Sequence, residues 1–269
     1  MFLQLNGATR LFCIVGDPIE QVKSPSRLTP IIQQQGHNAV LVPIQVSAND
    51  FDTFMDTAKR IKNMDGILIT IPHKFAAFKH CDQTGPRSSF LQVTNVLRRE
   101  KDGLWFGDHT DGPGFLNGMR EAGVDPKDER ALLVGAGGAG SAIAFELLQE
   151  GAPQLAIHDV VIGRRDDLVF RLNTRFPGRA VTGSSDPKGF GVVINATPLG
   201  MNPQDEFPIQ IDRLEPYAFV GDVVTEPSIT NLIEAARRRG CRTQTGAGMF
   251  DGQANIVVDF LLSTVNQAN

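Results

Sequence analysis

The segment from Ala131 to Asp159 constrains the fold of this chain more than any other. It runs through an apolar stretch, a glycine-rich turn, a helix-like stretch and a second apolar stretch that ends in Asp159. The turn reads Gly135-Ala136-Gly137-Gly138-Ala139-Gly140. Such glycines let the backbone approach a pyrophosphate, the following helix N-terminus offers N–H groups to phosphates, and a carboxylate can bind a ribose diol.

The spacing supports this interpretation, because Asp159 follows Gly135 by 24 residues, close to the roughly 20 expected of a dinucleotide-binding unit. The segment therefore predicts strand, turn, helix and strand around a nicotinamide cofactor. The alternative is a tight strand–helix packing turn in some other α/β protein, which would not need the acid at the second strand's tip.

Composition narrows the class of protein further. The chain has 269 residues, 41% apolar and 21% charged, with a net charge of −4, which is ordinary for a globular protein of one large or two modest domains. Because the net charge is negative, the chain has no overall positive potential of the kind that binds nucleic acid. The run Arg237–Arg239 precedes Gly240 and is better explained as cations at a helix C-terminus.

Localisation signals are also absent from the sequence as given. Residues 1–10 lack a charged leader with an apolar core, and the glycine-interrupted stretch 131–145 is too short to span a membrane. Cys13, Cys81 and Cys241 are far apart and have no metal-ligand spacing. We therefore expect reduced thiols, a cytoplasmic protein and no metal site.

Strands alternate with helices along the chain, which predicts mostly parallel sheets. Expected strands are 11–15, 39–46, 66–71, 192–195 and 219–224, with a hairpin-like pair at 91–99 and 103–106. Ser24 resembles a helix N-cap followed by Pro25 at the first helical position. Other expected helices are 51–61, 114–122, 231–239 and 255–265. Two α/β lobes are the predicted architecture, with ligands at the carboxyl ends of strands.

Two charged residues follow strand ends and suit alcohol oxidation. Lys74 comes just after the strand that ends before Pro72, and Asp111 precedes Gly112 at a strand–helix junction. As hydride leaves a carbinol carbon the hydroxyl must lose a proton, and a lysine can manage that proton while a carboxylate orients it. From spacing alone, a surface lysine and an N-cap aspartate explain these residues equally well.

At these positions the chain resembles the shikimate/quinate dehydrogenase family nearly end to end. The segments that carry the resemblance are Gly16-Asp17-Pro18-Ile19, Val22-Lys23-Ser24-Pro25, Leu68-Ile69-Thr70-Ile71-Pro72-His73-Lys74, Asn95-Val96-Leu97, Gly107-Asp108-His109-Thr110-Asp111-Gly112, Asn195-Ala196-Thr197-Pro198-Leu199-Gly200-Met201 and Gly246-Ala247-Gly248-Met249 with Gln253-Ala254. Several motifs in order across two lobes are specific, and they favour Lys74 and Asp111 as the catalytic pair.

The resemblance implies the division of the chain and its site. Residues 1–110 with 250–269 would form the substrate-binding and catalytic domain, and residues 111–249 the Rossmann-type NAD domain, with the C-terminal helix packing back on the first lobe. Substrate contacts would come from Ser24, Thr70, Asn95, Thr225 and Gln253. Beside the glycine turn, cofactor contacts would come from Asp159, Arg164, Thr197, Met201, Val223, Gly246 and Met249.

Departures from the family pattern concern substrate recognition. Val22 and Thr225 stand where relatives carry a serine and a tyrosine that help to hold the substrate carboxylate, and Leu68 replaces an asparagine. Val96 and His109 replace a threonine and a further asparagine. Hydrogen bonds to a charged partner contribute roughly 1.5–3 kcal/mol each, so we expect weakened binding of shikimate.

The choice between NAD and NADP is predicted from the residue that ends the segment from Ala131 to Asp159. NADP-using relatives carry an Asn-Arg-Thr type segment at this position, whereas this chain has Asp159. Its carboxylate would accept hydrogen bonds from the ribose hydroxyls and repel a 2′-phosphate. NAD is therefore the expected cofactor. NADP is the alternative, because Arg164 and Arg165 could bind its 2′-phosphate.

The leading hypothesis is an NAD-dependent dehydrogenase of a small cyclic hydroxy acid, acting as a monomer or homodimer without nucleic-acid or membrane partners. The alternative is a dinucleotide-binding sensor or partner-binding protein with little turnover.

Overall fold

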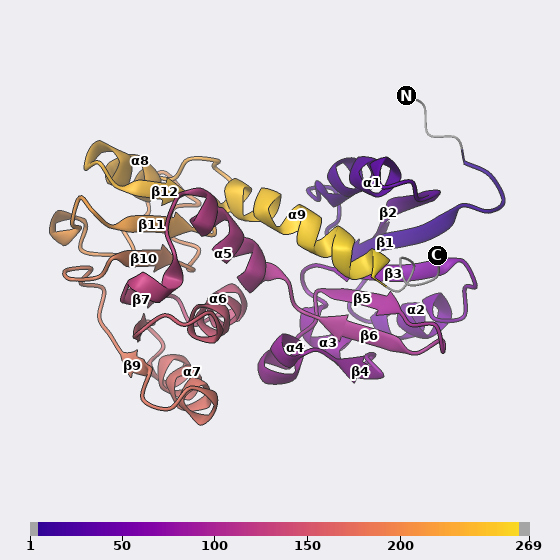
Figure 1. Cartoon of the computed structure of the whole chain (residues 1–269), viewed down its shortest axis with the longest axis horizontal. Coiled ribbons are helices and arrows are strands. Elements are labelled where there is room, and N and C mark those ends of the chain that lie inside the picture. The colour runs from indigo at the N-terminus through magenta and orange to yellow at the C-terminus, as the bar shows by residue number, and fades with distance from the viewer. Residues whose placement is uncertain (1–4, 264–269) are drawn as a thin grey trace. The chain divides into compact units, whose positions relative to one another are not determined.

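A computed structural model describes residues 5–263 of the chain. The chain forms two compact units (Figure 1). The first comprises residues 1–110 together with 254–269, and the second comprises residues 111–253. The boundary between the units falls once before helix α5 and once inside the last helix, α9.

The first unit contains a six-stranded mixed sheet in the order β2-β1-β3-β5-β6-β4. β1, β2 and β3 are parallel, whereas β5 runs antiparallel to both β3 and β6. The elements are β1 (Arg10–Gly16), α1 (Ser24–Gln34), β2 (Ala39–Gln45), α2 (Phe51–Ala58), β3 (Met64–Ile69), α3 (Lys74–Phe78), β4 (Gln83–Thr84), α4 (Pro86–Leu91), β5 (Val96–Arg99) and β6 (Trp105–Asp108).

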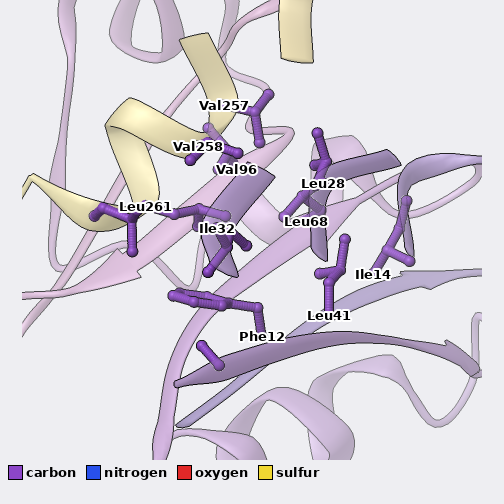
Figure 2. Close-up of a cluster of buried hydrophobic side chains, with 12 residues drawn as sticks. Phe12, Ile14, Leu28, Ile32, Leu41, Leu68, Val96, Val257, Val258 and Leu261 are labelled. Carbon is purple, nitrogen blue, oxygen red and sulfur yellow. The ribbon is translucent and has the colours of Figure 1, made fainter. Parts of the chain in front are cut away.

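Strand β1 is apolar throughout its centre because both faces of the sheet are covered. Phe12 and Ile14 point to one cluster, which also contains residues of α1 and of α9, as Figure 2 shows. Cys13 and Val15 belong to a second cluster with residues of α2. The C-terminal helix α9 (Gly246–Leu262) contributes Val257, Val258, Leu261 and Leu262 to the first cluster. It therefore packs on the first unit, as predicted.

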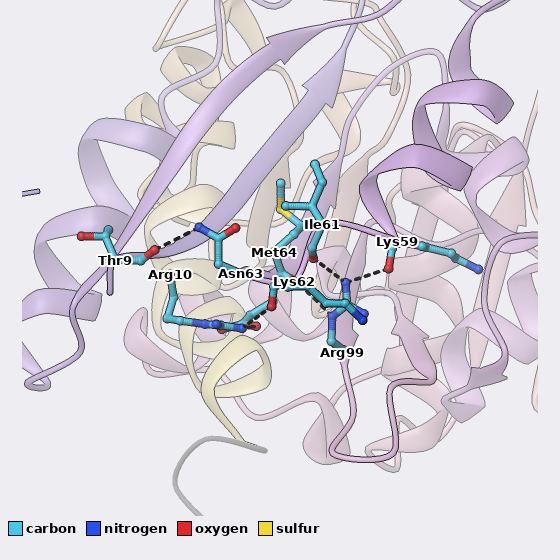
Figure 3. A network of polar contacts seen from close by, with 9 residues as sticks. Thr9, Arg10, Lys59, Ile61, Lys62, Asn63, Met64 and Arg99 are labelled. Carbon is cyan, nitrogen blue, oxygen red and sulfur yellow. Dashed lines mark hydrogen bonds and ion pairs between the residues drawn. The ribbon is translucent and has the colours of Figure 1, made fainter. Parts of the chain in front are cut away.

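Arginine side chains tie the loop after α2 to the sheet (Figure 3). Arg99 of β5 donates hydrogen bonds to the carbonyls of Lys59, Ile61 and Met64, at 2.9, 3.0 and 2.9 Å. Arg10 of β1 donates to the carbonyl of Lys62 at 3.0 Å. The carbonyls at the end of α2 thus find donors outside the helix, which fixes the entry into β3.

The second unit contains a six-stranded sheet that is parallel throughout, in the order β12-β11-β10-β7-β8-β9. The chain order reverses between β7 and β10, and such a switch point is where α/β sheets bind dinucleotides. The elements are α5 (Asp111–Glu121), a 3-10 turn (Pro126–Asp128), β7 (Ala131–Val134), α6 (Gly138–Gln149), β8 (Leu155–His158), α7 (Ile162–Arg175), β9 (Ala180–Thr182), β10 (Val192–Asn195), a second 3-10 turn (Ile211–Arg213), β11 (Phe219–Asp222), α8 (Asn231–Arg238), β12 (Arg242–Gln244) and the start of α9.

Three expectations about local structure were wrong. The N-cap of α1 is Lys23, not Ser24, and Ser24 already lies in the first helical turn. Leu91 ends helix α4 instead of opening a strand. Helix α9 begins at Gly246, earlier than the predicted start at residue 255, because Gly246 fits against the carbonyl of Val224 and Gly252 allows close packing on α5. The predicted end of this helix at residue 265 lies outside the described residues.

The search for membrane-spanning helices covered the described part of the chain. No helix within residues 5–263 is both long enough and apolar enough to span a bilayer.

Candidate active site

The glycine turn after β7 is shaped by close backbone contacts. Gly135 has φ of +103°, and a Cβ there would lie 2.6 Å from the carbonyl oxygen of Ala196. A Cβ on Gly140 would lie 1.9 Å from the carbonyl oxygen of Gly135. Glycine is therefore required at both positions, one to turn the chain and the other to seat α6 against the turn.

The middle of the turn is open. A Cβ on Gly137 or Gly138 would meet no atom within 4 Å. Gly137 is the N-cap of the twelve-residue helix α6, and no side chain of the described residues caps its first N–H groups. A helix N-terminus that is bordered by open space and lacks a side-chain cap fits a pyrophosphate, so these residues fit a dinucleotide.

Asp159, at the tip of β8, is buried and holds the turn. Its carboxylate accepts hydrogen bonds from the backbone N–H groups of Ala136 and Val161, each at 2.8 Å. Arg164 lies 3.6 Å away. Burial raises the pKa of Asp159, but the two N–H groups and the guanidinium outweigh it and hold that pKa below its usual value. The carboxylate therefore supports the turn in addition to any ribose contact.

The loop after β10 lies against the same turn. A Cβ on Gly135 would lie 2.9 Å from the side-chain methyl of Thr197. Asn195 accepts hydrogen bonds from the N–H and the hydroxyl of Thr197, at 3.0 and 2.7 Å. Further along the loop, Met201 is exposed. Of the predicted cofactor residues, the structure brings together the glycine turn, Asp159, Arg164 and Thr197.

The segment after β11 is held close to the start of α9. A Cβ on Gly246 would lie 2.4 Å from the carbonyl oxygen of Val224 and 2.7 Å from that of Val223. Only glycine fits there. Thr225 is exposed, and Met249 is partly buried within the first turn of α9.

Lys74 is the first residue of α3 and follows the end of β3. Its carbonyl accepts a hydrogen bond from the N–H of Thr94 at 3.0 Å. The neighbouring ring of His73 is 2% exposed, stacks on Phe51 with centroids 4.3 Å apart, and bonds the carbonyl of Val46 at 2.8 Å. Sequence reasoning gave His73 no role, but its packing fixes the backbone that carries Lys74.

Other predicted substrate residues of the first unit surround the ends of β3 and β5. The N–H of Ile69 donates to the carbonyl of Asn95 at 2.8 Å. The side-chain oxygen of Asn95 accepts from the N–H and hydroxyl of Thr110, at 2.9 and 3.2 Å. Thr70 continues β3, with its N–H bonded to the carbonyl of Val15 at 2.9 Å. Lys74, Thr70 and Asn95 thus share one edge of the sheet.

The departures near this edge are apolar in the structure. Leu68 is 6% exposed and belongs to the core cluster of Figure 2. Val22 packs against that cluster, and Ser24 is buried at the start of α1. Val22 and Leu68 therefore extend the core and offer the substrate no hydrogen bonds.

Asp111 lies in the second unit, as the first residue of α5. The amide of Gln253 donates a hydrogen bond to its carboxylate at 3.0 Å. Gly114 makes this approach possible, since a Cβ there would lie 2.7 Å from the Cβ of Gln253. The structure thus joins Asp111 to Gln253, whereas the pairing of Asp111 with Lys74 stays a prediction.

Two observations on residues 5–263 concern candidate metal ligands and the buried thiol of Cys13. No group of three or more His, Cys, Asp or Glu residues in that range could hold a metal ion. Burial raises the pKa of Cys13 to about 12, so this thiol is not a nucleophile at neutral pH.

The site therefore belongs to an NAD(P)-dependent oxidoreductase with a Rossmann-type sheet. A family model for the shikimate dehydrogenase substrate binding domain matches residues 14–97. The NADP-dependent shikimate dehydrogenase of Lysinibacillus sphaericus strain C3-41 is 30% identical over 263 residues, which cover 96% of this chain and 94% of that protein.

Two solved structures are similar along nearly the whole chain. The ligand-free 5-ketofructose reductase of Gluconobacter sp. strain CHM43 has a TM-score of 0.88 and 26% identity, covering 95% of this chain and 93% of its own. The quinate dehydrogenase of Corynebacterium glutamicum in complex with NAD has a TM-score of 0.85 and 27% identity, covering 95% and 94%. The chain belongs to the shikimate/quinate dehydrogenase family.

Proposed function

We propose that this chain is an NAD-preferring dehydrogenase that interconverts a shikimate- or quinate-like cyclic hydroxy acid and its 3-dehydro ketone. The observation that carries the proposal is the Asp111 carboxylate held by Gln253, in a chain that also carries Lys74 at the start of α3 and an open glycine turn before α6. The alternative, a dinucleotide sensor, would have no use for a carboxylate held in this way.

The proposed chemistry assigns one task to each residue. NAD, held by the glycine turn and Thr197, would supply the acceptor for the hydride that leaves the carbinol carbon. Lys74 takes up the hydroxyl proton through its amine and, in the reverse direction, its ammonium donates that proton to the carbonyl oxygen. Asp111 would orient the Lys74 amine for this transfer, and Gln253 fixes the rotamer of the Asp111 carboxylate. Thr70 and Asn95 bind further hydroxyls of the substrate.

NAD preference is supported by the tip of β8. Val160 and Val161 follow Asp159 and are 90% and 48% exposed, so the first two positions after the acid offer no cation to a 2′-phosphate. Arg164 lies beside Asp159 and is partly neutralised by it. Relatives use either cofactor, since the L. sphaericus enzyme is named for NADP and the C. glutamicum structure contains NAD.

A second candidate substrate is a neutral polyhydroxy ketone. Val22 packs against the apolar core at the position where relatives carry a serine that helps to hold the substrate carboxylate, and Leu68 lies in that core where relatives carry an asparagine. A ketose without a carboxylate would not need those groups, and one similar structure is a 5-ketofructose reductase. This candidate keeps the roles of Lys74 and Asp111 unchanged.

The test is NADH formation and consumption over shikimate, quinate, their 3-dehydro ketones and neutral keto sugars, with NAD(H) and NADP(H) in parallel. Turnover of a cyclic hydroxy acid with NAD above NADP is expected. Turnover restricted to neutral ketones would establish the second candidate, and tight NADH binding without any turnover would establish the sensor.

Lys74→Ala provides the mechanistic test. Loss of a proton-transfer group lowers kcat by about 10²–10⁴, while NADH affinity should stay near that of the wild type because the glycine turn lies in the other unit. Lys79→Ala is the matched control, since Lys79 is an exposed lysine at the end of the same short helix. Near-normal turnover of Lys74→Ala would remove Lys74 from the mechanism.

A further inference from the structure

Asp222 is a fully buried carboxylate to which the proposed chemistry gives no task. It is the last residue of β11 and is 0% exposed. Ionised carboxylates are kept in protein interiors only where donors surround them. Asp222 has several such donors, and they come from strand β10 and from the segment that follows β11.

The first donor is Asn195, which ends the neighbouring strand β10 and lies directly across from Asp222 in the sheet. Its amide nitrogen donates to Asp222 Oδ1 at 3.1 Å and to the carbonyl of Leu199 at 3.0 Å. Its oxygen accepts the two hydrogen bonds from Thr197. Asn195 is thus saturated, and its orientation determines the course of the loop from residue 195 to residue 201.

The other donors belong to the segment after β11. The N–H of Val224 donates to Asp222 Oδ1 at 3.0 Å, and the hydroxyl of Thr230 donates to Oδ2 at 2.7 Å. Thr230 is also the N-cap of α8, where its oxygen accepts from the N–H of Ile233. A Cβ on Gly200 would lie 3.2 Å from Thr230, so the two loops touch.

These two loops flank one half of the predicted dinucleotide site. The glycine turn of β7 contacts Ala196 and Thr197 on one side and Asp159 of β8 on the other. If the adenosine half of the dinucleotide binds beside Asp159, its nicotinamide half would lie over the carboxyl ends of β10 and β11. Gly246, a predicted cofactor residue, packs on the carbonyls of Val223 and Val224 from this same segment.

We propose that Asp222 is a positioning residue, whose buried carboxylate fixes the loops 195–201 and 223–230 through Asn195 and Thr230 and thereby sets the binding geometry of the nicotinamide half of the cofactor. This inference rests on the proposed dinucleotide-dependent function. It does not depend on which alcohol is the substrate, because it concerns the cofactor alone.

The test compares two ligands that share the adenosine half. NADH contains the nicotinamide ring, and ADP-ribose lacks it. Asp222→Asn keeps the size of the side chain but turns an amide donor toward donors of Asn195, Val224 or Thr230. We expect NADH affinity to fall roughly tenfold or more, with the affinity for ADP-ribose nearly unchanged. A purely structural role would weaken both ligands equally or neither.

Three further variants keep the test decisive. Thr230→Val removes one donor to Asp222 and should show the same selective loss in a smaller degree, even if Asp222→Asn does not fold. Thr230→Ser retains the hydroxyl, so it should bind NADH with an affinity close to that of the wild type. Asp159→Asn, on the adenosine side, should weaken both ligands.

Equal weakening of NADH and ADP-ribose in Asp222→Asn and Thr230→Val would overturn the inference, as would unchanged affinity for both. Failure of the wild type to bind either ligand would instead refute the proposed dinucleotide-dependent function.

Discussion

Replacement of Asp159 by alanine should damage the glycine turn as well as the choice of cofactor. The side chain of Asp159 is 5% exposed, and its carboxylate accepts hydrogen bonds from the backbone N–H groups of Ala136 and Val161. Each buried donor left without an acceptor costs about 1–3 kcal/mol, and water will reach part of the vacated space. We therefore expect Asp159→Ala to lose about 2–4 kcal/mol of unfolding free energy.

Ligand binding should change in two ways. NAD and NADP should both bind more weakly, because the turn that cradles the pyrophosphate is no longer held. The ratio of their affinities should move toward NADP, because a negative charge near the 2′ position is gone. Urea unfolding measures the first effect, and titration with both reduced cofactors by fluorescence measures the second.

The contribution of Asp159 also depends on pH. Its pKa in the folded protein lies below the unfolded value of 3.8, so its stabilisation is fully present above that value and is lost as the pH falls through the folded pKa. The stability difference between wild type and Asp159→Ala should therefore shrink in acid.

Asp166→Ala is the control, since that aspartate is 51% exposed and pairs with Arg165. Exposed pairs are worth about 0–1 kcal/mol. An Asp159→Ala protein as stable as Asp166→Ala, or one that loses NAD affinity alone, would refute this reasoning.

Two further substitutions test the packing around α5 and α9. Neither side-chain polar atom of Gln244 has a hydrogen-bond partner within residues 5–263, although the residue is 5% exposed; Gln244→Met should therefore raise the unfolding free energy in urea by about 1 kcal/mol, and a loss of stability would mean that the amide is satisfied. Gly114→Ala should push Gln253 away from Asp111, lowering stability by about 1–3 kcal/mol and kcat with it, whereas Gly163→Ala, a helical glycine with open space around it, should be neutral or stabilising; equal behaviour of the two alanine variants would contradict the close contact.

The elements of the fold were largely predictable where the hydrophobic periodicity agrees with the glycine and proline residues that end strands and helices. Val192–Asn195 matches its predicted strand, and the parallel sheet around the glycine turn was expected from strand–helix alternation. Helix α9 was predicted too short because Gly246 and Gly248 look like loop residues. In the structure Gly246 permits a close contact with Val224 and Gly252 permits one with α5, and a single sequence does not contain that tertiary information.

The candidate site was predictable only in its charged and glycine residues. Lys74, Asp111 and the glycine turn follow strand ends, where position alone suggests a role. The supports were not foreseen: Asp159 holding Ala136, Gln253 holding Asp111, and His73 stacking on Phe51. These contacts join residues distant in sequence, and no local pattern encodes them.

Two buried carboxylates of the second unit, Asp159 and Asp222, hold the glycine turn and the loops beside it in a single conformation. Asp159 directly follows β8 on one side of β7, and Asp222 ends β11 beyond β10 on the other. Each carboxylate collects N–H or O–H donors from a loop that would otherwise be free to move. Because these loops are ordered before a ligand arrives, binding need not pay for ordering them. The same residues that stabilise the fold would therefore preorganise both halves of the cofactor site.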